Sequence, residues 1–262
     1  MKISYVLAAV MVALTFLINI TRHTVPPYLE GTPISVPLQA SPIEKELYYD
    51  WPSVYEKIDY LNKRYGESVW EHLEEIPAAY QKELVSTPVW QGFLPQILGY
   101  HLPPAPWFEK ISQGEVWRTF TPALIHTDLW HLVFNLFWLI ALGRLVEERT
   151  GWAKYLLLTL LFGILSNTAQ YLMTGLHFLG YSGVISGLFG YAYMDKKHGT
   201  LYPLAPSLFT VTFVFIFGVA LLETISLFSP LKMSWGIANT AHITGLLSGL
   251  IAGQLLPSKE PA

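Results

Sequence analysis

Residues 129–146 read LWHLVFNLFWLIALGRLV, and this stretch decides what kind of protein the chain is. It contains a single fully charged side chain, that of Arg144. A helix needs about 20 mostly apolar residues to cross the hydrocarbon of a bilayer. The stretch is therefore predicted to be a transmembrane helix, and two polar side chains in it, His131 and Asn135, are predicted to lie within the membrane.

The whole chain has the composition of a membrane protein. Of its 262 residues, 52% are hydrophobic and 13% are charged, which is about half the charged share of an ordinary soluble domain. The formal net charge of −3 leaves no basic field to hold nucleic acid. Cysteine is absent, which excludes disulfides, cysteine zinc sites and thiol nucleophiles.

Hydropathy predicts a multi-pass protein. The first candidate span follows Met1-Lys2 and resembles a signal peptide in position, but its long apolar run and the lack of a cleavage site favour a retained helix. The short fourth span is rich in glycine, which suits a helix buried among others. The six candidates are residues 3–20, 129–146, 152–173, 179–194, 204–228 and 237–256.

Basic residues predict the orientation of these spans. If the six spans alternate, most lysines and arginines near span ends fall on one side, which the positive-inside rule assigns to the cytoplasm. We therefore expect an integral protein of the cytoplasmic (inner) membrane with both termini inside. The residues that carry this prediction are Lys2, Arg144, Arg149, Lys154, Lys196, Lys197 and Lys259.

The expected domain layout has four parts. Residues 1–20 form the first transmembrane helix, 21–114 a long external loop with a small helical insertion, 115–256 the core with spans two to six, and 257–262 a cytoplasmic tail. The insertion is interpreted either as a helical cap on the outer surface or as a module that recruits substrates or partners.

Two helices are predicted in the external loop. Asp50 or Ser53 is expected to cap a helix whose apolar residues recur at helical spacing and which ends at Gly66. Ser68, followed three residues later by a glutamate, resembles a capping box for a second helix that ends before Pro77.

Polar groups are predicted at one depth on three different helices. Spans two, four and six all run from outside to inside, so His131, Ser182 and His242 lie within about two helical turns of the external face. Asn135 follows His131 by four residues and shares its helix face. Polar groups inside a membrane are costly and are functional candidates by default. We expect these side chains to share one cavity.

Glycines provide the close helix contact that such a cavity needs. Small residues four apart let helix backbones approach without side chains between them. The fourth and sixth spans each carry such a pattern, formed by Gly183, Gly187 and Gly190 and by Gly245, Gly249 and Gly253.

The residue types predict acyl transfer, here hydrolysis of a peptide bond. A serine hydroxyl becomes a nucleophile when a neutral imidazole takes its proton, which makes Ser182 and His242 a candidate pair. The oxyanion formed by the attack needs donors, for which Asn135, His131 and the backbone N–H groups at the start of the fourth helix are candidates.

Two other functions could use polar residues of these types, a metal site and a transport relay. A metal site made by His126, His131 and His242 conflicts with the spacing of the first two, because residues five apart do not share a helix face. A secondary transporter predicts inverted repeats and charges at the midplane, and the sequence shows neither. We expect no metal and no cofactor.

These residues also carry a resemblance to a known family. Over residues 115–253 the chain resembles the rhomboid intramembrane serine proteases, with the matching pieces in the family's order. The pieces are Trp117-Arg118, His131-x-x-x-Asn135, Gly180-x-Ser182-Gly183 and Ala241-His242-x-x-Gly245-x-x-x-Gly249.

The resemblance implies an all-α fold, a six-helix transmembrane bundle that cleaves transmembrane segments of other proteins near the external face. It implies partners in the bilayer and no nucleic acid or nucleotide. By the match, Ser182 is the nucleophile and His242 the general base of a dyad without an acid. His131 and Asn135 then help to form the oxyanion hole.

Four further residues take structural roles by the same resemblance. Trp117 and Arg118 belong to a loop that lies partly in the outer leaflet of the membrane. Glu147 and Arg149, at the inner end of the second span, look like the family's structural polar pair.

The chain departs from the family pattern at two positions. Ser186 replaces an aromatic residue that often stacks on the catalytic imidazole, and Pro122 replaces a polar residue in the loop before the second span. The alternative function is that of a weak or inactive rhomboid-like protein that binds transmembrane clients. Such relatives lack the serine or the histidine, whereas Ser182 and His242 are both present here.

Overall fold

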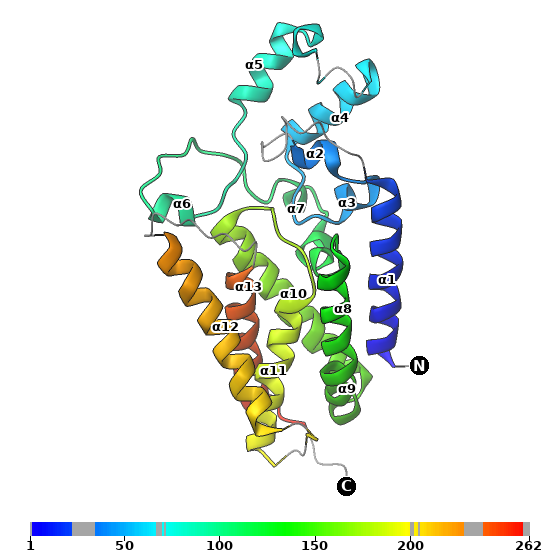
Figure 1. Ribbon diagram of the computed structural model, residues 1–262, viewed down its shortest axis with the longest axis vertical. Coiled ribbons are helices and arrows are strands. Elements are labelled where there is room, and N and C mark those ends of the chain that lie inside the picture. The colour runs from blue at the N-terminus through cyan, green and yellow to red at the C-terminus, as the bar shows by residue number, and fades with distance from the viewer. Residues whose placement is uncertain are drawn as a thin grey trace.

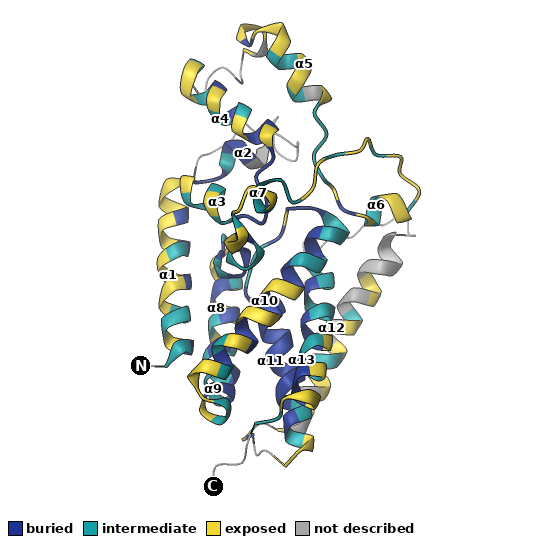
Figure 2. Cartoon of the chain, turned by 180° about the vertical axis from the view of Figure 1, so that it is seen from behind, coloured by how far each residue is buried: buried dark blue, intermediate teal, exposed yellow. Residues whose placement is uncertain are grey.

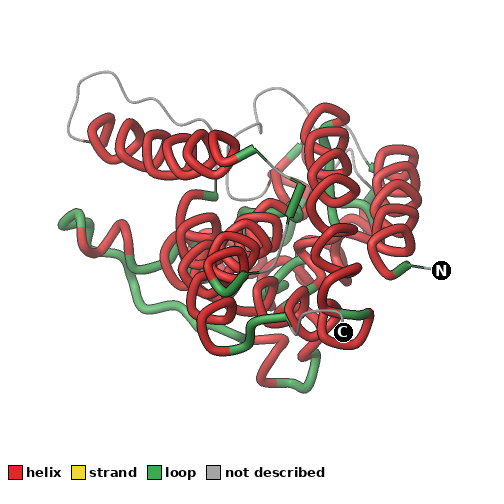
Figure 3. The backbone as a smooth tube through the Cα atoms, turned by 90° about the horizontal axis from the view of Figure 1, so that it is seen from below, coloured by secondary structure: helices red, strands yellow, loops and turns green. Residues whose placement is uncertain are grey.

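The computed structural model describes residues 2–22, 35–66, 70, 72–199, 202, 203, 205–227 and 238–258. In these residues every regular element is helical, and no strand occurs (Figure 3). Long helices form a bundle, and the shorter helices of residues 35–112 are stacked at one of its ends (Figure 1). An all-α membrane fold is the class that the sequence predicts.

A helix occupies each of the six stretches predicted to span the membrane. The second of these is continuous through a π-helical turn, η6 (Leu139–Gly143). The helices are α1 (Ile3–Thr21), α8 and α9 (Leu129–Trp138 and Arg144–Thr150), α10 (Trp152–Thr174), α11 (Ser182–Lys197), α12 (Pro206–Leu227) and α13 (Asn239–Leu255).

Three of the described helices are by themselves long and apolar enough to cross a bilayer. They are α1, the continuous helix at residues 129–150, and α10. By length and composition they are candidate membrane spans.

Helix α11 lies at the centre of the bundle. Every residue from 183 to 192 is buried, and the helix is dark along most of its length in Figure 2. A helix that is apolar on all sides is stable only when other helices surround it. This explains why a short, glycine-rich stretch forms a regular helix here.

The start of α1 and the end of α13 lie at the same end of the bundle. Lys2 pairs with Glu148, just before the turn between α9 and α10. Lys154, just after that turn, donates to the carbonyl of Leu256 at 2.6 Å. The helices of residues 35–112 cover the opposite end (Figure 1). Lys259, used in the orientation prediction, lies outside the described residues.

Short helices alternate with loops in residues 35–124. They are α2 (Ser35–Gln39), α3 (Pro42–Leu47), α4 (Ser53–Tyr65), η3 (Leu73–Glu75), α5 (Ala78–Ser86), α6 (Leu94–Ile97), α7 (Glu109–Ser112), η4 (Val116–Thr119) and η5 (Thr121–Leu124).

The segment of residues 35–112 shares a hydrophobic core with the bundle. The ring of Tyr49 stacks on that of Tyr171, near the end of α10, with the centroids 4.5 Å apart. Ile18 of α1 and Phe178, in the loop before α11, are buried in the same cluster. The segment is thus packed onto the helix ends rather than tethered above them.

The helix predicted after Asp50 exists, but the capping prediction is wrong. The residue before α4 is Pro52, and no side chain caps the helix start. The buried Asp50 carboxylate instead accepts hydrogen bonds from the backbone N–H groups of Glu109 and Lys110, both at 3.0 Å, and from the Tyr171 hydroxyl at 2.7 Å. Asp50 therefore joins two distant segments to α10.

The ends of the predicted helices agree with the structure only in part. Gly66 ends α4 with a φ of 83°, as predicted. Ser68 and Glu71 lie outside the described residues. In the described part of the second predicted helix, residues 73–75 form one 3-10 turn, and the next α-helix, α5, begins after Pro77.

Candidate active site

Ser182 and His242 meet at the end of the bundle nearest residues 35–112. Ser182 is the first residue of α11, and His242 lies in the first turn of α13. Nε2 of His242 is 2.7 Å from Oγ of Ser182, a hydrogen-bond distance. Both residues are half-buried. The pair therefore combines a hydroxyl, a base within reach of its proton, and access from one side.

Glycines allow α11 and α13 to touch backbone to backbone. A Cβ atom placed on Gly245 would lie 2.1 Å from the carbonyl oxygen of Gly183, and one placed on Gly249 would lie 1.9 Å from that of Gly187. Real Cβ atoms essentially never come closer than 3.0 Å. The two predicted glycine patterns thus face each other, and this close packing brings Ser182 to His242.

Helix α10 holds the start of α13 in place. The side-chain oxygen of Gln170 accepts a hydrogen bond from the Ala241 N–H at 2.9 Å, and its amide nitrogen donates to Thr174 at 2.8 Å. The first N–H groups of a helix have no acceptor within the helix, so Gln170 provides one next to His242. Gln170 was not among the predicted site residues, and its one signal in the sequence is a polar side chain inside a predicted span.

The turn before Ser182 requires glycine at position 180. Gly180 has a φ of 108°, and its N–H donates to the Pro122 carbonyl at 2.9 Å. A Cβ atom here would lie 2.5 Å from Cε1 of His131. Backbone conformation and the neighbouring ring both exclude a larger residue, and His131 lies directly against the turn that leads into Ser182.

Asn135 is bonded to His131, which lies against the turn before Ser182. Asn135 is buried, and its amide nitrogen donates to the His131 carbonyl at 2.8 Å. Asp128 caps α8 by accepting from the His131 N–H at 2.8 Å. Among the described residues, no hydrogen bond joins the side chain of Asn135 or His131 to Ser182 or His242. The Asn135 amide keeps a second N–H that this bond does not use.

His126 lies beside His131, contrary to the spacing argument. His126 precedes α8 rather than lying on it, so the two rings meet edge to face with centroids 5.0 Å apart. The pKa of His126 is lowered to about 3, mainly because the ring is buried and to a smaller extent because His131 lies beside it. Within the described part of the chain, no three His, Cys, Asp or Glu side chains form a group that could bind a metal.

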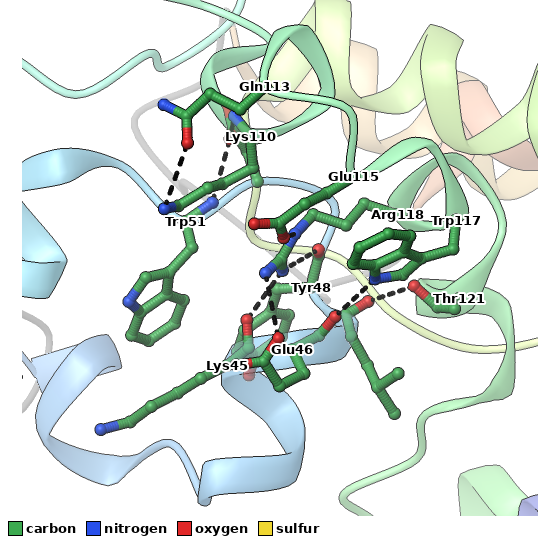
Figure 4. A network of polar contacts seen from close by, with 12 residues as sticks. Lys45, Glu46, Tyr48, Trp51, Lys110, Gln113, Glu115, Trp117, Arg118 and Thr121 are labelled. Atoms are coloured by element: carbon green, nitrogen blue, oxygen red, sulfur yellow. Dashed lines mark hydrogen bonds and ion pairs between the residues drawn. The ribbon is translucent and has the colours of Figure 1, made fainter.

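The Trp117-Arg118 pair holds the last turn of α3 (Figure 4). Arg118 is 2% exposed, and its guanidinium donates to the carbonyls of Lys45 at 2.7 Å and Tyr48 at 3.0 Å. The Trp117 indole N–H donates to the Glu46 carbonyl at 3.3 Å. The end of a helix leaves such carbonyls without partners, and these two side chains supply donors for them.

Replacing Arg118 with alanine is expected to destabilise the protein by about 1–3 kcal/mol, because it removes a charged donor from one part-buried and one buried carbonyl and the ion-pair partner of Glu115. Thr121, which donates to the Leu47 carbonyl at 2.8 Å, holds the same turn but carries no charge. Thermal unfolding in detergent measures the effect, at roughly 2–4 °C per kcal/mol. The exposed Arg64 provides a matched control, and equal shifts for Arg118→Ala and Arg64→Ala would contradict the prediction.

Glu147 contacts α1 and not Arg149. Its carboxylate accepts hydrogen bonds from the N–H of Ile3 at 2.6 Å, the N–H of Ser4 at 2.9 Å and the hydroxyl of Ser4 at 2.7 Å. No ion pair joins Glu147 to Arg149 among the described residues. The expected polar pair is therefore replaced by a carboxylate that caps the start of α1, where the helix dipole favours negative charge.

Ser186 bonds to the backbone of its own helix. Its hydroxyl donates to the carbonyl of Ser182 at 2.9 Å, and the side chain is buried. No aromatic ring contacts the His242 imidazole in the described residues. The imidazole is instead held by its contact with Ser182 and by the packing of α13.

Comparison with known proteins places the chain among rhomboids. The model of the rhomboid domain matches residues 113–259, more than half of the chain. The rhomboid protease GlpG of an Enterobacter species is 37% identical over 138 residues, which cover 53% of this chain and 48% of the relative. That of Yersinia pseudotuberculosis is 34% identical over 141 residues, or 52% and 47% of the two chains.

A third relative aligns over more of its length. The rhomboid protease GlpG of Haemophilus influenzae is 34% identical over 167 residues, which cover 62% of this chain and 82% of the relative. The chain thus spans about half the length of the first two relatives and most of the third. The resemblance found in the sequence motifs is confirmed, and the chain belongs to the rhomboid family.

Proposed function

We propose that this protein is an intramembrane serine endopeptidase that hydrolyses peptide bonds in or next to transmembrane segments of other membrane proteins. The observation that supports this most strongly is the 2.7 Å contact between Ser182 Oγ and His242 Nε2. A hydroxyl with a base within reach of its proton is the minimum that nucleophilic acyl transfer needs. Family membership supports the same reaction class.

The proposed reaction has two halves. His242 Nε2 takes the proton of the Ser182 hydroxyl while Oγ attacks the peptide carbonyl carbon, and the protonated imidazole then gives that proton to the leaving amine as the C–N bond breaks. Water, deprotonated by His242, next attacks the acyl-enzyme ester. The ester bond breaks, Ser182 regains its proton, and no cofactor takes part.

The oxyanion is proposed to bind at the start of α11. The N–H groups of Ser182 and Gly183 have no acceptor within their helix, and the helix dipole favours negative charge at this end. The second N–H of the Asn135 amide, which has no acceptor among the described residues, and the ring of His131 are the proposed side-chain donors. His131 lies against Gly180, two residues before the nucleophile.

Replacing Asn135 with alanine is expected to slow cleavage about 10²-fold, the usual loss for one oxyanion donor. The measurement is the initial rate of cleavage by purified protein in liposomes. Asn167, another buried amide, donates to the carbonyls of Thr119 and Phe120 and gives the control Asn167→Ala. A rate unchanged in Asn135→Ala would remove Asn135 from the proposed oxyanion site.

The proposed membrane arrangement has six spans with both termini in the cytoplasm. The contacts of Lys2 with Glu148 and of Lys154 with Leu256 support it, since they gather basic residues at the end where α1 begins and α13 ends. The proposed layout is a first span at 1–20, an external segment at 21–114, a catalytic core at 115–256 and a cytoplasmic tail at 257–262. Glu147, bonded to α1, supports a retained first helix.

Cleavage of a single-span substrate by the purified wild-type protein in liposomes tests the proposal. We expect a cut near the end of the span closest to residues 35–112, located by mass spectrometry of the products. If the wild type is inert toward several substrates but still binds them, the protein is a client-binding rhomboid and the proposal fails. Among the described residues the imidazole has no aromatic neighbour, because Ser186 stands at that position. Replacing Ser186 with an aromatic residue would then be the first substitution to test.

A further inference from the structure

Four hydrogen-bond donors converge on the side chain of Asp50, which is 1% exposed. One carboxylate oxygen, Oδ1, accepts from the N–H groups of Trp51 and Lys110, both at 3.0 Å. The other, Oδ2, accepts from the Glu109 N–H at 3.0 Å and from the Tyr171 hydroxyl at 2.7 Å. Asp50 therefore fastens the segment that follows α3, the start of α7 and the end of α10 to one another.

An ionised carboxylate suits this position because it only accepts hydrogen bonds, through two oxygens. An amide has one accepting oxygen, and its nitrogen donates. The change Asp50→Asn therefore keeps the shape of the side chain but turns a donor toward two other donors. A buried donor that loses its acceptor is costly, so this change is expected to break two of the four bonds without creating a cavity.

The last turn of α10 is held from one side by the segment of residues 35–112. Besides donating to Asp50, the Tyr171 hydroxyl accepts a hydrogen bond from the Phe108 N–H at 3.0 Å. The Leu172 carbonyl accepts from the Phe93 N–H at 2.7 Å. The carbonyls at the end of a helix have no donors within it, and this segment supplies one of them.

The same turn contacts α13 on another side. Consecutive residues of a helix point about 100° apart, and Gln170, the neighbour of Tyr171, accepts the Ala241 N–H at 2.9 Å. The next residue of α13 is His242. Two side-chain hydrogen bonds and one helical turn thus connect the buried carboxylate of Asp50 to the backbone beside the proposed general base.

We propose that Asp50 is a positioning residue for His242 and acts through the last turn of α10. The carboxylate fixes that turn, and Gln170 on the turn fixes the start of α13, so that the imidazole stays within reach of the Ser182 hydroxyl. The inference rests on the proposed function and extends it. Residues 35–112, which the family match at 113–259 does not cover, become part of the support of the active site.

The loss of this contact is expected to change turnover rather than substrate binding. Asp50 is buried and does not contact substrate. A shift of about 1 Å in a reacting pair costs about 10²-fold in rate, so the smaller shift that follows the loss of hydrogen bonds should lower kcat about tenfold in Asp50→Asn. KM should stay within about twofold of the wild type. Initial rates in liposomes at several substrate densities give both constants.

Two further variants show whether Asp50 acts through α10. Tyr171→Phe removes the hydroxyl but keeps the ring, so it should lower kcat by as much as Asp50→Asn, and the double variant should be no worse, because the two side chains share one bond. Asp59 of α4 is the matched control. It lies in the same segment and pairs with Lys45, and Asp59→Asn should leave kcat within about twofold, the usual effect of losing a partly exposed ion pair.

Hydrogen exchange measures the same contact without any cleavage, because the N–H groups at a helix start exchange faster when their acceptor moves. The full-length variants in liposomes are exposed to deuterated water, and mass spectrometry follows residues 238–245. The proposal predicts severalfold faster exchange there in Asp50→Asn and Tyr171→Phe than in the wild type and Asp59→Asn. Gln170→Ala, which removes the acceptor itself, sets the upper limit of the effect.

Wild-type exchange at residues 238–245 in Asp50→Asn, or an equal increase in Asp59→Asn, would overturn the proposal. Faster exchange spread evenly over the bundle would show that Asp50 only stabilises the fold, and a wild-type kcat beside faster local exchange would show that the contact does not position the base. Either result overturns it too. If the wild type cleaves no substrate, the proposed function fails, and the exchange pattern still decides whether Asp50 holds the start of α13.

Discussion

Replacing Ser182 with alanine is expected to reduce cleavage of a single-span substrate by roughly 10³-fold or more, because removal of a nucleophile leaves only binding and oxyanion stabilisation. His242→Ala should lose as much, since the two side chains act as a unit and their effects do not add. The double variant should be no worse than either single one. Initial rates in liposomes measure all three.

Ser186 provides the matched control for this experiment. It lies one helical turn after Ser182, and among the described residues its hydroxyl makes one hydrogen bond, to the Ser182 carbonyl at 2.9 Å. Losing such a bond costs about 1 kcal/mol, so Ser186→Ala should keep cleavage within about tenfold. Ser182→Ala should unfold at nearly the wild-type temperature, because the Ser182 hydroxyl hydrogen-bonds only to His242 among the described residues. Substantial cleavage by Ser182→Ala would contradict the assignment of the nucleophile.

Replacing Gly245 with valine is expected to separate α11 from α13. The cleavage rate should fall although Ser182 and His242 are unchanged. A Cβ atom at this position would lie 2.1 Å from the Gly183 carbonyl oxygen, so the backbones must move apart by about 1 Å to reach the 3.0 Å limit. A shift of this size in a catalytic pair costs about 10²-fold in rate. Overpacking should also destabilise the fold by about 1–3 kcal/mol.

Leu247 provides the control on the same helix. Its side chain is 48% exposed, and Leu247→Val should change neither the cleavage rate nor the unfolding temperature much. The two variants are compared by cleavage in liposomes and by thermal unfolding in detergent. If Gly245→Val kept the wild-type cleavage rate and the wild-type unfolding temperature, the close helix contact would not position the pair.

The helical framework was predictable because each of its signals is local. Apolar runs of about 20 residues define the helices, and a glycine such as Gly66 ends a helix wherever its backbone adopts a positive φ. The capping prediction failed because Asp50 finds its partners at Glu109, Lys110 and Tyr171, far away in sequence. Such bonds depend on tertiary packing, which a local pattern does not contain.

The candidate pair was accessible from sequence for a different reason. Alternating spans assign a depth to every intramembrane residue, so Ser182 and His242 could be placed at one level before their helices were seen to touch. Glu147 was expected beside Arg149, but the backbone N–H groups of α1 attract its carboxylate more effectively. Arg118 pairs locally with Glu115, but it also donates to backbone carbonyls some 70 residues earlier, and no side-chain pattern reports an acceptor of that kind.

Reaction with a fluorophosphonate, which modifies activated serine hydroxyls, tests the central claim most directly. The protein in liposomes is treated with the reagent, and the modified residue is located by mass spectrometry in the wild type, His242→Ala and Ser186→Ala. We predict a single adduct on Ser182 in the wild type and in Ser186→Ala, and none in His242→Ala. An adduct on another serine, or one on Ser182 that persists without His242, would contradict the proposed dyad.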